Sequence, residues 1–229
     1  LLFENSACFT PYTPRPLHDG WPVVVCYTDA SRKPETMEGG YGGWLIVYPQ
    51  DNDTVRHITV YYFYGKFSPE EIEICDINEL ECKAADIAAG LADKIVPSIY
   101  GGDVSDDKHM QPQSDADVND NKDIMMHYLY AFGDSKVVFD HVMPGASANS
   151  HGLRFLYRQR AIADSHKPRL VVTQHVLRGR NMPADSLSNG QVQKFMAEMA
   201  LLLGPELTFI QLDVSLEESS LSALVDWKR

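Results

Sequence analysis

Three short apolar segments joined by turn-forming residues precede one long amphipathic segment, and this order limits the fold more than any other feature of the chain. Each apolar segment is rich in β-branched and aromatic residues and is bounded by Pro, Gly, Asp or Asn, which is typical of buried strands. The predicted strands are residues 23–27, 44–48 and 55–64. We interpret the Gly-rich segment 39–43 and the sequence Asp51-Asn52-Asp53 as turns. Short connections of this kind predict an antiparallel meander.

The segment that follows, residues 76–95, has the pattern of a helix that buries one face. Its apolar side chains recur every three or four residues, which places them on one stripe. They are Ile77, Leu80, Ala84, Ile87, Ala88, Leu91 and Ile95. We expect Pro97 to end this helix, because proline lacks the backbone N–H that a helix interior requires.

The second half of the chain contains strand and helix patterns in alternation. We predict strands over residues 125–132 and 169–177, and helices over residues 135–142, 149–163 and 183–203. Residues 207–212 are a further strand candidate. The order predicts the α/β class, with a mixed sheet covered by helices.

Composition divides the chain into one domain with appendages. Residues 1–20 are rich in Pro and Thr and are predicted to be an irregular arm, and residues 21–203 form the predicted domain. Within the domain, residues 100–123 contain Gly, Asp, Ser, Gln and Asn with few apolar residues, which predicts a mobile acidic insertion. Residues 204–229 are predicted to be a C-terminal extension.

The charge is unevenly distributed. The formal net charge is −12, which taken alone disfavours a nucleic-acid partner. Residues 70–123 hold 15 acidic against 4 basic side chains, whereas residues 149–194 hold 8 basic against 2 acidic ones. A basic stretch of this kind is either a solvated surface or a phosphate-binding surface, and the charge pattern does not decide between them.

Three features bear on where the protein works. No apolar run approaches the roughly 20 residues needed to span a bilayer, so we expect no membrane partner. No secretory leader pattern is present. The four cysteines show no CxxC spacing and are expected to be free thiols. We therefore expect an intracellular protein of the cytoplasm or the nucleus.

Four carboxylates occupy special positions among the predicted elements. Asp29 ends the first strand, Glu81 lies on the first long helix, Asp134 ends the fourth strand, and Asp185 lies in the first turn of the closing helix. Three of them have ordinary explanations when taken singly: a turn residue at Asp29, a helix N-cap at Asp134 and a helix-dipole partner at Asp185.

Glu81 is harder to explain as an ordinary surface residue. It falls at the edge of the apolar stripe, so it faces the sheet, while Glu79 is expected on the opposite, solvent-facing side. A helix packed over the first strand would bring Glu81 near Asp29, and a fourth strand beside the first would add Asp134. Carboxylates that close repel one another unless a cation neutralises them. Oxygen ligands without His or Cys favour Mg²⁺ or Mn²⁺ over zinc.

Four motifs, in order along the chain, now resemble a known family. They are Thr28-Asp29-Ala30-Ser31 followed by Gly39-Gly40-Tyr41-Gly42; Ile77-Asn78-Glu79-Leu80-Glu81-Cys82-Lys83-Ala84-Ala85; Asp134-Ser135-Lys136-Val137; and a closing motif with His175, Gly179, Asn181, Asp185 and Ser188. Residues 23–188 resemble the ribonuclease H domain attached to retrotransposon-type reverse transcriptases. Each motif alone is weak, whereas four in this order, each on its expected element, are a specific signal.

The resemblance implies a ribonuclease H-like fold: a mixed five-stranded sheet, three antiparallel strands and then two parallel ones, covered by helices. It also implies endonucleolytic hydrolysis of the RNA strand of an RNA–DNA hybrid by a two-metal mechanism with two Mg²⁺ ions, for which Mn²⁺ is an alternative. By this similarity Asp29 bridges both metals, Glu81 and Asp134 complete one site, and Asp185 completes the other. The implied partners are the hybrid and an upstream reverse-transcriptase domain.

The chain departs from cellular members of the family in the connection before Asp185. Those relatives carry a histidine on a flexible loop there, whereas residues 177–181 contain none. Arg178, Arg180 and Asn181 are therefore candidates for contact with nucleic acid, and His175 is expected to be structural. Residues Arg154 and Arg158, one helical turn apart, are a second candidate pair.

Two other functions remain open. A catalytically inactive ribonuclease H-like scaffold in a larger nucleoprotein assembly would usually lack a carboxylate, and here all four candidates are present. An integrase, transposase or proofreading exonuclease fits less well, because the exonucleases use Asp-x-Glu on the first strand and integrases usually end with Glu, whereas this chain has Asp29-Ala30-Ser31 and Asp185.

Overall fold

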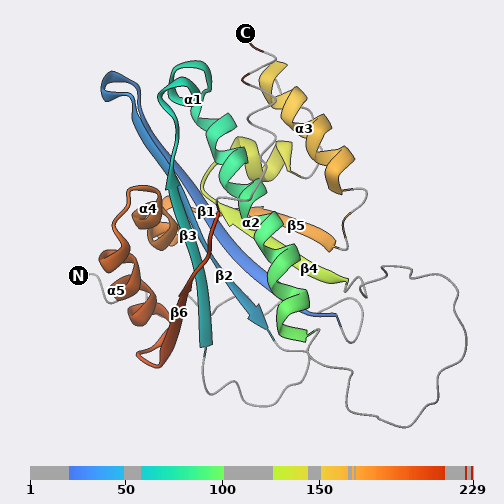
Figure 1. Ribbon diagram of the computed structural model, residues 1–229, viewed down its shortest axis with the longest axis vertical. Helices are drawn as coiled ribbons and strands as arrows, with labels where there is room; N and C mark the ends of the chain where they lie inside the picture. The colour runs from blue at the N-terminus through green and yellow to red at the C-terminus, as the bar shows by residue number, and fades with distance from the viewer. Residues whose placement is uncertain are drawn as a thin grey trace, which may run out of the picture.

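A computed structural model gives the architecture of the chain (Figure 1). It describes residues 21–48, 58–100, 126–143, 151–164, 167, 169–214, 225 and 228. The predicted arm 1–20 and almost all of the predicted insertion 100–123 lie outside these residues.

The core is a mixed six-stranded sheet with the order β5-β4-β1-β2-β3-β6. Its strands are β1 (Val23–Lys33), β2 (Glu38–Tyr48), β3 (Ile58–Lys66), β4 (His127–Gly133), β5 (Arg169–His175) and β6 (Leu207–Gln211). The pairs β1–β2 and β2–β3 are antiparallel, and β1–β4 and β4–β5 are parallel. The three antiparallel and two parallel strands of the predicted ribonuclease H-like fold are thereby confirmed.

The predicted count of five strands is wrong by one. The sixth strand, β6, pairs in parallel with β3, at the free edge of the three antiparallel strands. Leu207 and Phe209 are half-buried while the other three residues of the strand are exposed, and Phe209 packs edge-on against Phe195, with ring centroids 5.8 Å apart. A five-residue strand gives a weak sequence signal, so this long-range packing decides its state.

Helices cover both faces of the sheet (Figure 1). Two helices, α2 (Ile77–Tyr100) and α3 (His151–Asp164), lie on one face, while α4 (Met182–Ser188) and α5 (Val192–Leu203) lie on the other. Side chains of β1 alternate between the two cores: Val24 and Cys26 pack under α2, and Val25 and Tyr27 pack on the side of α4 and α5. Because both faces of β1 are buried, its sequence from residue 23 to residue 27 is a continuous apolar run.

The Gly-rich segment 39–43 was predicted to be a turn but lies inside β2. The turn is formed earlier, by a single 3-10 turn over Pro34–Thr36 followed by Met37 in a left-handed conformation. The glycines serve packing instead. A Cβ atom added at Gly42 would lie 2.5 Å from the Leu187 Cβ atom, so the absence of a side chain lets α4 rest directly on the strand.

Pro97 was predicted to end α2, but the helix continues to Tyr100. Proline so near the end removes only one backbone hydrogen bond, and tertiary contacts hold the last turn. Val96 is completely buried, and the Tyr100 hydroxyl donates to the Tyr48 carbonyl at 3.1 Å. Packing therefore outweighs the local cost of the proline.

The closing helix, predicted over residues 183–203, is two helices. Gly190, with a φ of 70°, separates α4 from α5 and lets the chain reverse direction. A short helix, α1 (Pro69–Ile74), was not predicted; Ser68 and Glu71 form a capping box that starts it. The predicted helix over 135–142 is present as a brief π-helical turn, Val138–Val142.

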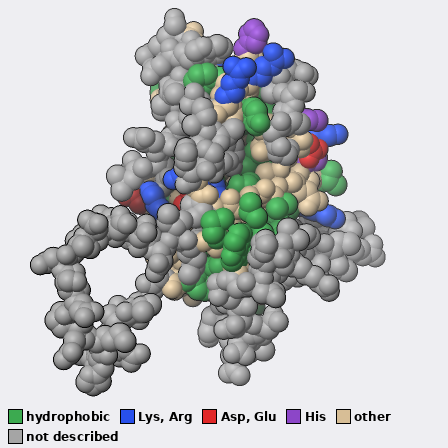
Figure 2. Space-filling view, turned by 90° about the vertical axis from the view of Figure 1, so that its right-hand side faces the viewer, with side chains coloured by type: hydrophobic (Ala, Val, Ile, Leu, Met, Phe, Trp, Pro, Cys, Tyr) green, Lys and Arg blue, Asp and Glu red, His purple; other side chains and the backbone are tan. Residues whose placement is uncertain are grey.

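Strand β5 forms the other edge of the sheet and exposes Leu170 and Val172 on one face. Figure 2 shows hydrophobic side chains at the surface of the side of the molecule that faces right in Figure 1, where β5 lies. Among the described residues, no helix is long and apolar enough to cross a membrane.

Candidate active site

Three carboxylates meet just beyond the last parallel pair of β1 and β4, Tyr27 with Phe132. Asp29 was predicted to end the first strand, but β1 continues to Lys33 because it stays paired with β2. Asp29, Glu81 and Asp134 each offer an oxygen, and these oxygens lie within 4.8 Å of one another. They line a cleft of about 450 Å³, together with Asp185 and Arg178. The carboxyl ends of neighbouring parallel strands share one sheet edge, which is where such folds place ligands. The structure thus brings Asp29, Glu81 and Asp134 together as expected, and Asp185 lines the same cleft.

Glu81 reaches the cleft because the start of α2 is firmly held. Asp76 and Glu79 form a reciprocal cap: the Glu79 amide donates to Asp76 at 3.0 Å, and the Asp76 amide donates to Glu79 at 2.8 Å. Glu81 follows within the first two turns and is 4% exposed. Contacts between α2 and β1 place this carboxylate beside Asp29 of β1, as the apolar stripe predicted.

The prediction that Glu79 faces solvent is wrong. Its side chain is 1% exposed and accepts from the Lys228 ammonium at 2.6 Å, and a Cβ atom on Gly152 would collide with it. The outer side of α2 at this point is covered by α3 and by residue 228 rather than by water. The helical periodicity of α2 cannot show contacts with segments this far apart in sequence, which is why the prediction failed.

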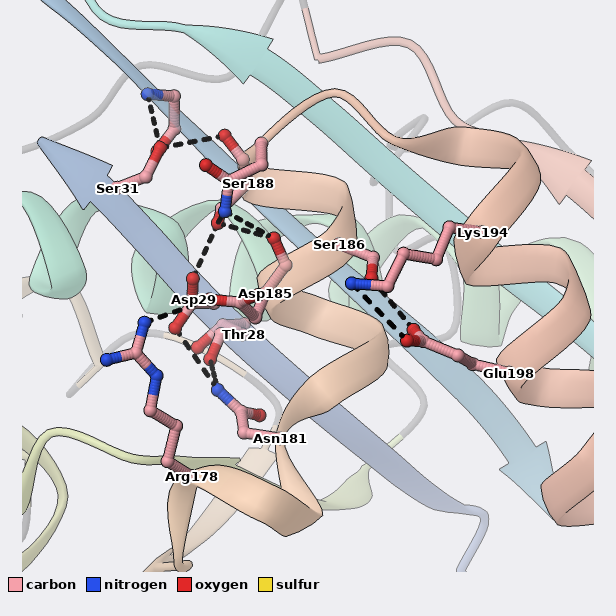
Figure 3. A network of polar contacts seen from close by, with 12 residues as sticks. Thr28, Asp29, Ser31, Arg178, Asn181, Asp185, Ser186, Ser188, Lys194 and Glu198 are labelled. Carbon is pink, nitrogen blue, oxygen red and sulfur yellow. Dashed lines mark hydrogen bonds and ion pairs between the residues drawn. The ribbon is translucent and has the colours of Figure 1, made fainter.

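Asp29 is held from the side of α4 (Figure 3). The Ser188 hydroxyl donates to its Oδ2 at 2.5 Å, and the Asn181 amide donates to its Oδ1 at 3.3 Å and to the Thr28 carbonyl at 3.0 Å. Asp29 itself is 4% exposed. Both oxygens of the carboxylate are therefore engaged by donors, each of which uses one of the two lone pairs.

Asp134 is not the N-cap of the turn that follows it. The Ser135 hydroxyl takes that place by accepting from the Val138 amide at 3.3 Å, and it also lies 3.0 Å from Asn78 Oδ1 on α2. The ordinary explanation considered for Asp134 does not apply, and its half-buried carboxylate lines the cleft.

Asp185 occupies the more open side of the cleft. Its side chain is 29% exposed and forms an ion pair with Arg178, whose Nη2 lies 3.4 Å from Asp185 Oδ1. The Arg178 side chain is 82% exposed. A pair this open to water is weak and exchanges readily with solvent ions or other ligands.

Burial makes the inner carboxylates hard to ionise without a cation. It raises the pKa of Asp29 to about 7, with a further increase from Asp134 and Asp185 and a decrease from the Ser188 hydrogen bond. Burial also raises the pKa of Glu81 well above its usual value, and the charges of Asp29 and Asp134 add to that rise. Like charges held together in low dielectric account for both shifts.

The site fits a hard divalent cation. Among the described residues that line the cleft, the grouped ligand atoms are carboxylate oxygens, which Mg²⁺ and Mn²⁺ prefer. Glu81 Oε2 is buried and has no hydrogen-bond partner in the structure. A buried carboxylate oxygen without a partner, on a residue grouped with two other carboxylates, favours a bound positive charge, so Asp29, Glu81 and Asp134 are the residues that could hold a metal.

The four arginines predicted to contact nucleic acid lie in two places. Arg178 and Arg180 are exposed beside Asp185, on a single 3-10 turn (Arg178–Arg180). Arg154 and Arg158 are exposed on α3, outside the residues that line the cleft. Figure 2 shows Lys and Arg side chains at the upper end of the molecule, where α3 lies in Figure 1.

The prediction that Asn181 contacts nucleic acid is contradicted. Its side chain is completely buried and its amide is used to hold β1, as described above. The closing turn directs it inward because residue 181 also precedes α4 and packs against the sheet. It acts on the site through Asp29 rather than through a ligand.

Several cleft residues were missed by the sequence reasoning. Ser188 contacts Asp29, and Ser31, Arg32, Lys33 and Asn189 line the cleft. Ser31 and Ser188 belong to motifs noted above, which was the available signal. Arg32 and Lys33 carried none, because the first strand was predicted to stop before them.

Comparisons with known proteins bear on the fold. No protein-family model and no curated protein matches the chain. Similar solved structures include RNase H1 from the archaeon Halobacterium salinarum NRC-1, with 17% identity, a TM-score of 0.44, and coverage of 75% of this chain and 98% of that one. The N-terminal RNase H domain of a Mycobacterium tuberculosis protein gives 20% identity, a TM-score of 0.39, and coverage of 78% and 99%.

A third similar structure is LC11-RNase H1 in complex with an RNA/DNA hybrid, with 16% identity, a TM-score of 0.38, and coverage of 76% of this chain and 99% of that one. With TM-scores below 0.5, these similarities carry no argument by themselves, and the fold is assigned from the topology of the chain. The strand order, the parallel pairing of β1 with β4 and β4 with β5, and the helices on both faces are those of the ribonuclease H-like fold.

Proposed function

We propose that this protein is a metal-dependent ribonuclease H, which hydrolyses the RNA strand of RNA–DNA hybrids. The observation that carries the proposal is the cluster of Asp29, Glu81 and Asp134, with oxygens within 4.8 Å of one another in one cleft beside Asp185. A grouping of buried carboxylates costs stability unless it binds cations, so its presence favours a metal-dependent activity over a structural role.

Two divalent cations, Mg²⁺ or Mn²⁺, would supply an activated water and stabilise the charge that develops on the leaving oxygen. Asp29, Glu81 and Asp134 would hold one cation, and Asp29 with Asp185 the other. The protein's own contribution is orientation. Ser188 and Asn181 hold the Asp29 carboxylate in place.

Arg178 is proposed to contact the substrate. Its guanidinium is largely exposed at the rim of the cleft, and its pairing with Asp185 is weak enough to exchange for a phosphate. Guanidinium groups bind phosphate oxygens in a forked geometry, which suits the backbone of a nucleic acid. Arg180, on the same turn, is a second candidate.

The retroelement setting is also part of the proposal. It is supported by the closing motif, in which Asn181, Asp185 and Ser188 follow His175 at spacings close to those of retrotransposon domains. An upstream reverse-transcriptase domain is the expected partner. The scaffold alternative is disfavoured because all four carboxylates are present and line one cleft.

A cleavage assay tests the activity. Labelled RNA–DNA hybrid, duplex DNA and duplex RNA are each incubated with the protein and Mg²⁺ or Mn²⁺. We expect internal cuts in the RNA strand of the hybrid alone, which disappear with EDTA. The matched variants are Asp29→Asn, expected to be inactive, and Asp140→Asn, an exposed aspartate outside the cleft, expected to cleave normally.

Two results would contradict the proposal. Absence of cleavage by the folded wild-type protein with either metal would favour the scaffold function. Equal cleavage by the wild type and Asp29→Asn would show that the activity does not come from this cleft.

A further inference from the structure

Ser188, the last residue of α4, makes the shortest contact to Asp29 that the structure gives. Its hydroxyl oxygen lies 2.5 Å from Asp29 Oδ2, and the residue is 4% exposed (Figure 3). A hydroxyl donating to a carboxylate forms a charge-assisted hydrogen bond, which is shorter and stronger than a neutral one. The contact joins two elements that are 159 residues apart in the chain.

Of the two acceptors within reach of the Ser188 hydroxyl, only Asp29 has a free lone pair. The Asp185 carbonyl lies 3.0 Å from Ser188 Oγ, but it already accepts from the Asn189 backbone amide at 3.2 Å and from the Asn189 side-chain amide at 2.8 Å. A carbonyl oxygen has two lone pairs, so its capacity is met. The proton of Ser188 is therefore available to Asp29, which is nearer and carries a negative charge when it is ionised, as it is when a cation binds.

The backbone of Ser188 is fixed as well. The Ser31 hydroxyl donates to the Ser188 carbonyl at 2.9 Å and accepts from the Gly40 amide at 3.1 Å, which ties α4 to β1 and β2. Glycine is required for this approach, since a Cβ atom on Gly40 would lie 2.4 Å from the Ser188 carbonyl oxygen. Because the backbone of Ser188 is held by β1 and β2, its hydroxyl has a fixed position next to Asp29.

A direct chemical role for Ser188 does not fit its surroundings. A nucleophile or a substrate ligand must reach the open cleft, whereas this hydroxyl is buried behind Asp29 and is absent from the residues that line the cleft. What it can do is restrict Asp29.

We propose that Ser188 is a positioning residue for cation binding: it orients the Asp29 carboxylate and couples it to α4, the helix that carries Asp185. This inference rests on the proposed metal-dependent function. The hydrogen bond from Ser188 occupies one lone pair of Oδ2, and that from Asn181 occupies one of Oδ1, so each oxygen keeps a lone pair for a cation. Outer partners that orient a ligand in this way typically change metal affinity or activity by about 10–100-fold when removed.

The test measures binding of Mn²⁺ alone to the full chain, by electron paramagnetic resonance of the free ion. Ser188→Ala is expected to raise the Kd for Mn²⁺ by about tenfold or more. Ser186→Ala is the matched control: this buried serine of the same helix donates to Glu198 at 2.8 Å, away from the cleft, and should leave the Kd unchanged. Thermal unfolding of both variants separates a local effect from loss of the fold.

A second variant keeps the shape of the side chain. Ser188→Cys replaces the hydroxyl by a weak donor of similar size, so it should weaken Mn²⁺ binding in the same direction as alanine. In the cleavage assay both variants should lower kcat more than they raise KM for the hybrid, because substrate contacts are untouched.

The outcomes separate this inference from the function on which it rests. Wild type that binds Mn²⁺, with Ser188→Ala and Ser188→Cys binding equally well, overturns the positioning role and leaves the proposed function intact. Wild type that binds no Mn²⁺ overturns both. A raised Kd for both Ser188 variants, with Ser186→Ala at the wild-type value, supports the inference.

Discussion

The two sides of the cleft hold their carboxylates in opposite ways. On the inner side, Asp29 on β1 and Glu81 near the start of α2 are each 4% exposed and have raised pKa values because of burial. On the outer side, Asp185 is 29% exposed and is already paired with Arg178. The inner side is rigid and electrostatically unsatisfied, whereas the outer side is open and neutralised by the protein itself.

This difference shows how a cleft lined by carboxylates can belong to a stable fold and still be suited to bind a cation. The inner carboxylates create the demand for a cation, and the fold supports them through its core. The outer pair can exchange one partner for another at little cost, which suits the proposed contact between Arg178 and a substrate phosphate. The four predictions below test this division, from the largest expected effect to the smallest.

The first prediction compares the two aspartates directly. Asp29→Asn should lower kcat by about 10³-fold or more, because several kcal/mol of charge stabilisation are lost with the shared ligand. Asp185→Asn should lower it less, by about 10–100-fold, and high Mn²⁺ should partly restore it, because this residue is exposed and serves one cation only. Single-turnover cleavage of a hybrid measures both. Equal losses that no metal concentration restores would break the comparison.

The second prediction moves α4 without touching a carboxylate. In Gly42→Ala the new Cβ atom would lie 2.5 Å from the Leu187 Cβ atom and 2.6 Å from the Ser188 backbone nitrogen, so α4 must shift. A displacement of about 1 Å can cost 10²-fold in rate, and we expect a loss of about that size in kcat. Gly179→Ala, whose Cβ atom would meet nothing within 4 Å, is the control. Normal cleavage by Gly42→Ala would show that the exact position of α4 on the sheet does not affect activity.

The third prediction concerns stability without metal. The pKa of Asp29 rises from 3.8 to about 7 on folding, and that of Glu81 rises too. A raised folded-state pKa stabilises the fold at low pH, and this stabilisation is lost as the pH rises through the folded-state value. For Asp29 the loss falls between about pH 4 and pH 7. The metal-free protein should therefore become less stable over this range.

Glu81→Gln removes one of the two groups responsible. Metal-free Glu81→Gln should be more stable than the wild type at pH 8 by roughly 1–4 kcal/mol, as expected when an unpaired buried charge is removed. Urea unfolding in EDTA at pH 5 and pH 8 measures the difference, and Glu73→Gln, an exposed glutamate on α1, is the control. Parallel pH profiles for all three proteins would contradict the division between the two sides.

The fourth prediction addresses the outer side. Arg178→Ala should raise the Kd for the hybrid a few-fold and reduce the slope of log K against log salt by about 1, because one phosphate contact is lost. Lys194→Ala, which removes a cation from α5 outside the cleft, should leave the slope unchanged. Binding is measured by fluorescence anisotropy at several salt concentrations with inactive protein. A slope that Arg178→Ala does not change would argue against phosphate contact.

Sequence reasoning predicted that Asp29, Glu81 and Asp134 would lie close together because each is tied to a local pattern, and the structure groups them. Asp29 and Asp134 end apolar runs, and Glu81 interrupts a helical stripe at a defined angle. Periodicity says which side of one element a residue occupies. Periodicity does not show which other segments cover the opposite side of a helix. Glu79 was therefore predicted to face solvent, although α3 and residue 228 enclose it.

The same limit explains the errors around the closing motif. Asn181 was assigned to nucleic acid because it lies in the short connection before Asp185, yet it is completely buried against β1. The glycines of segment 39–43 were assigned to a turn by composition, whereas their role is to admit α4. Both errors concern contacts between distant segments.

The sequence by itself determined the α/β class, the order of the elements and the carboxylates that could carry chemistry, because these follow from local periodicity and residue type. Only the tertiary structure decided which donors hold Asp29, which oxygen of Glu81 lacks a partner, and why Gly42 has no side chain. The physical reason is that hydrogen-bond partners and close approaches depend on where separate elements meet in space. No single segment of the chain carries that information.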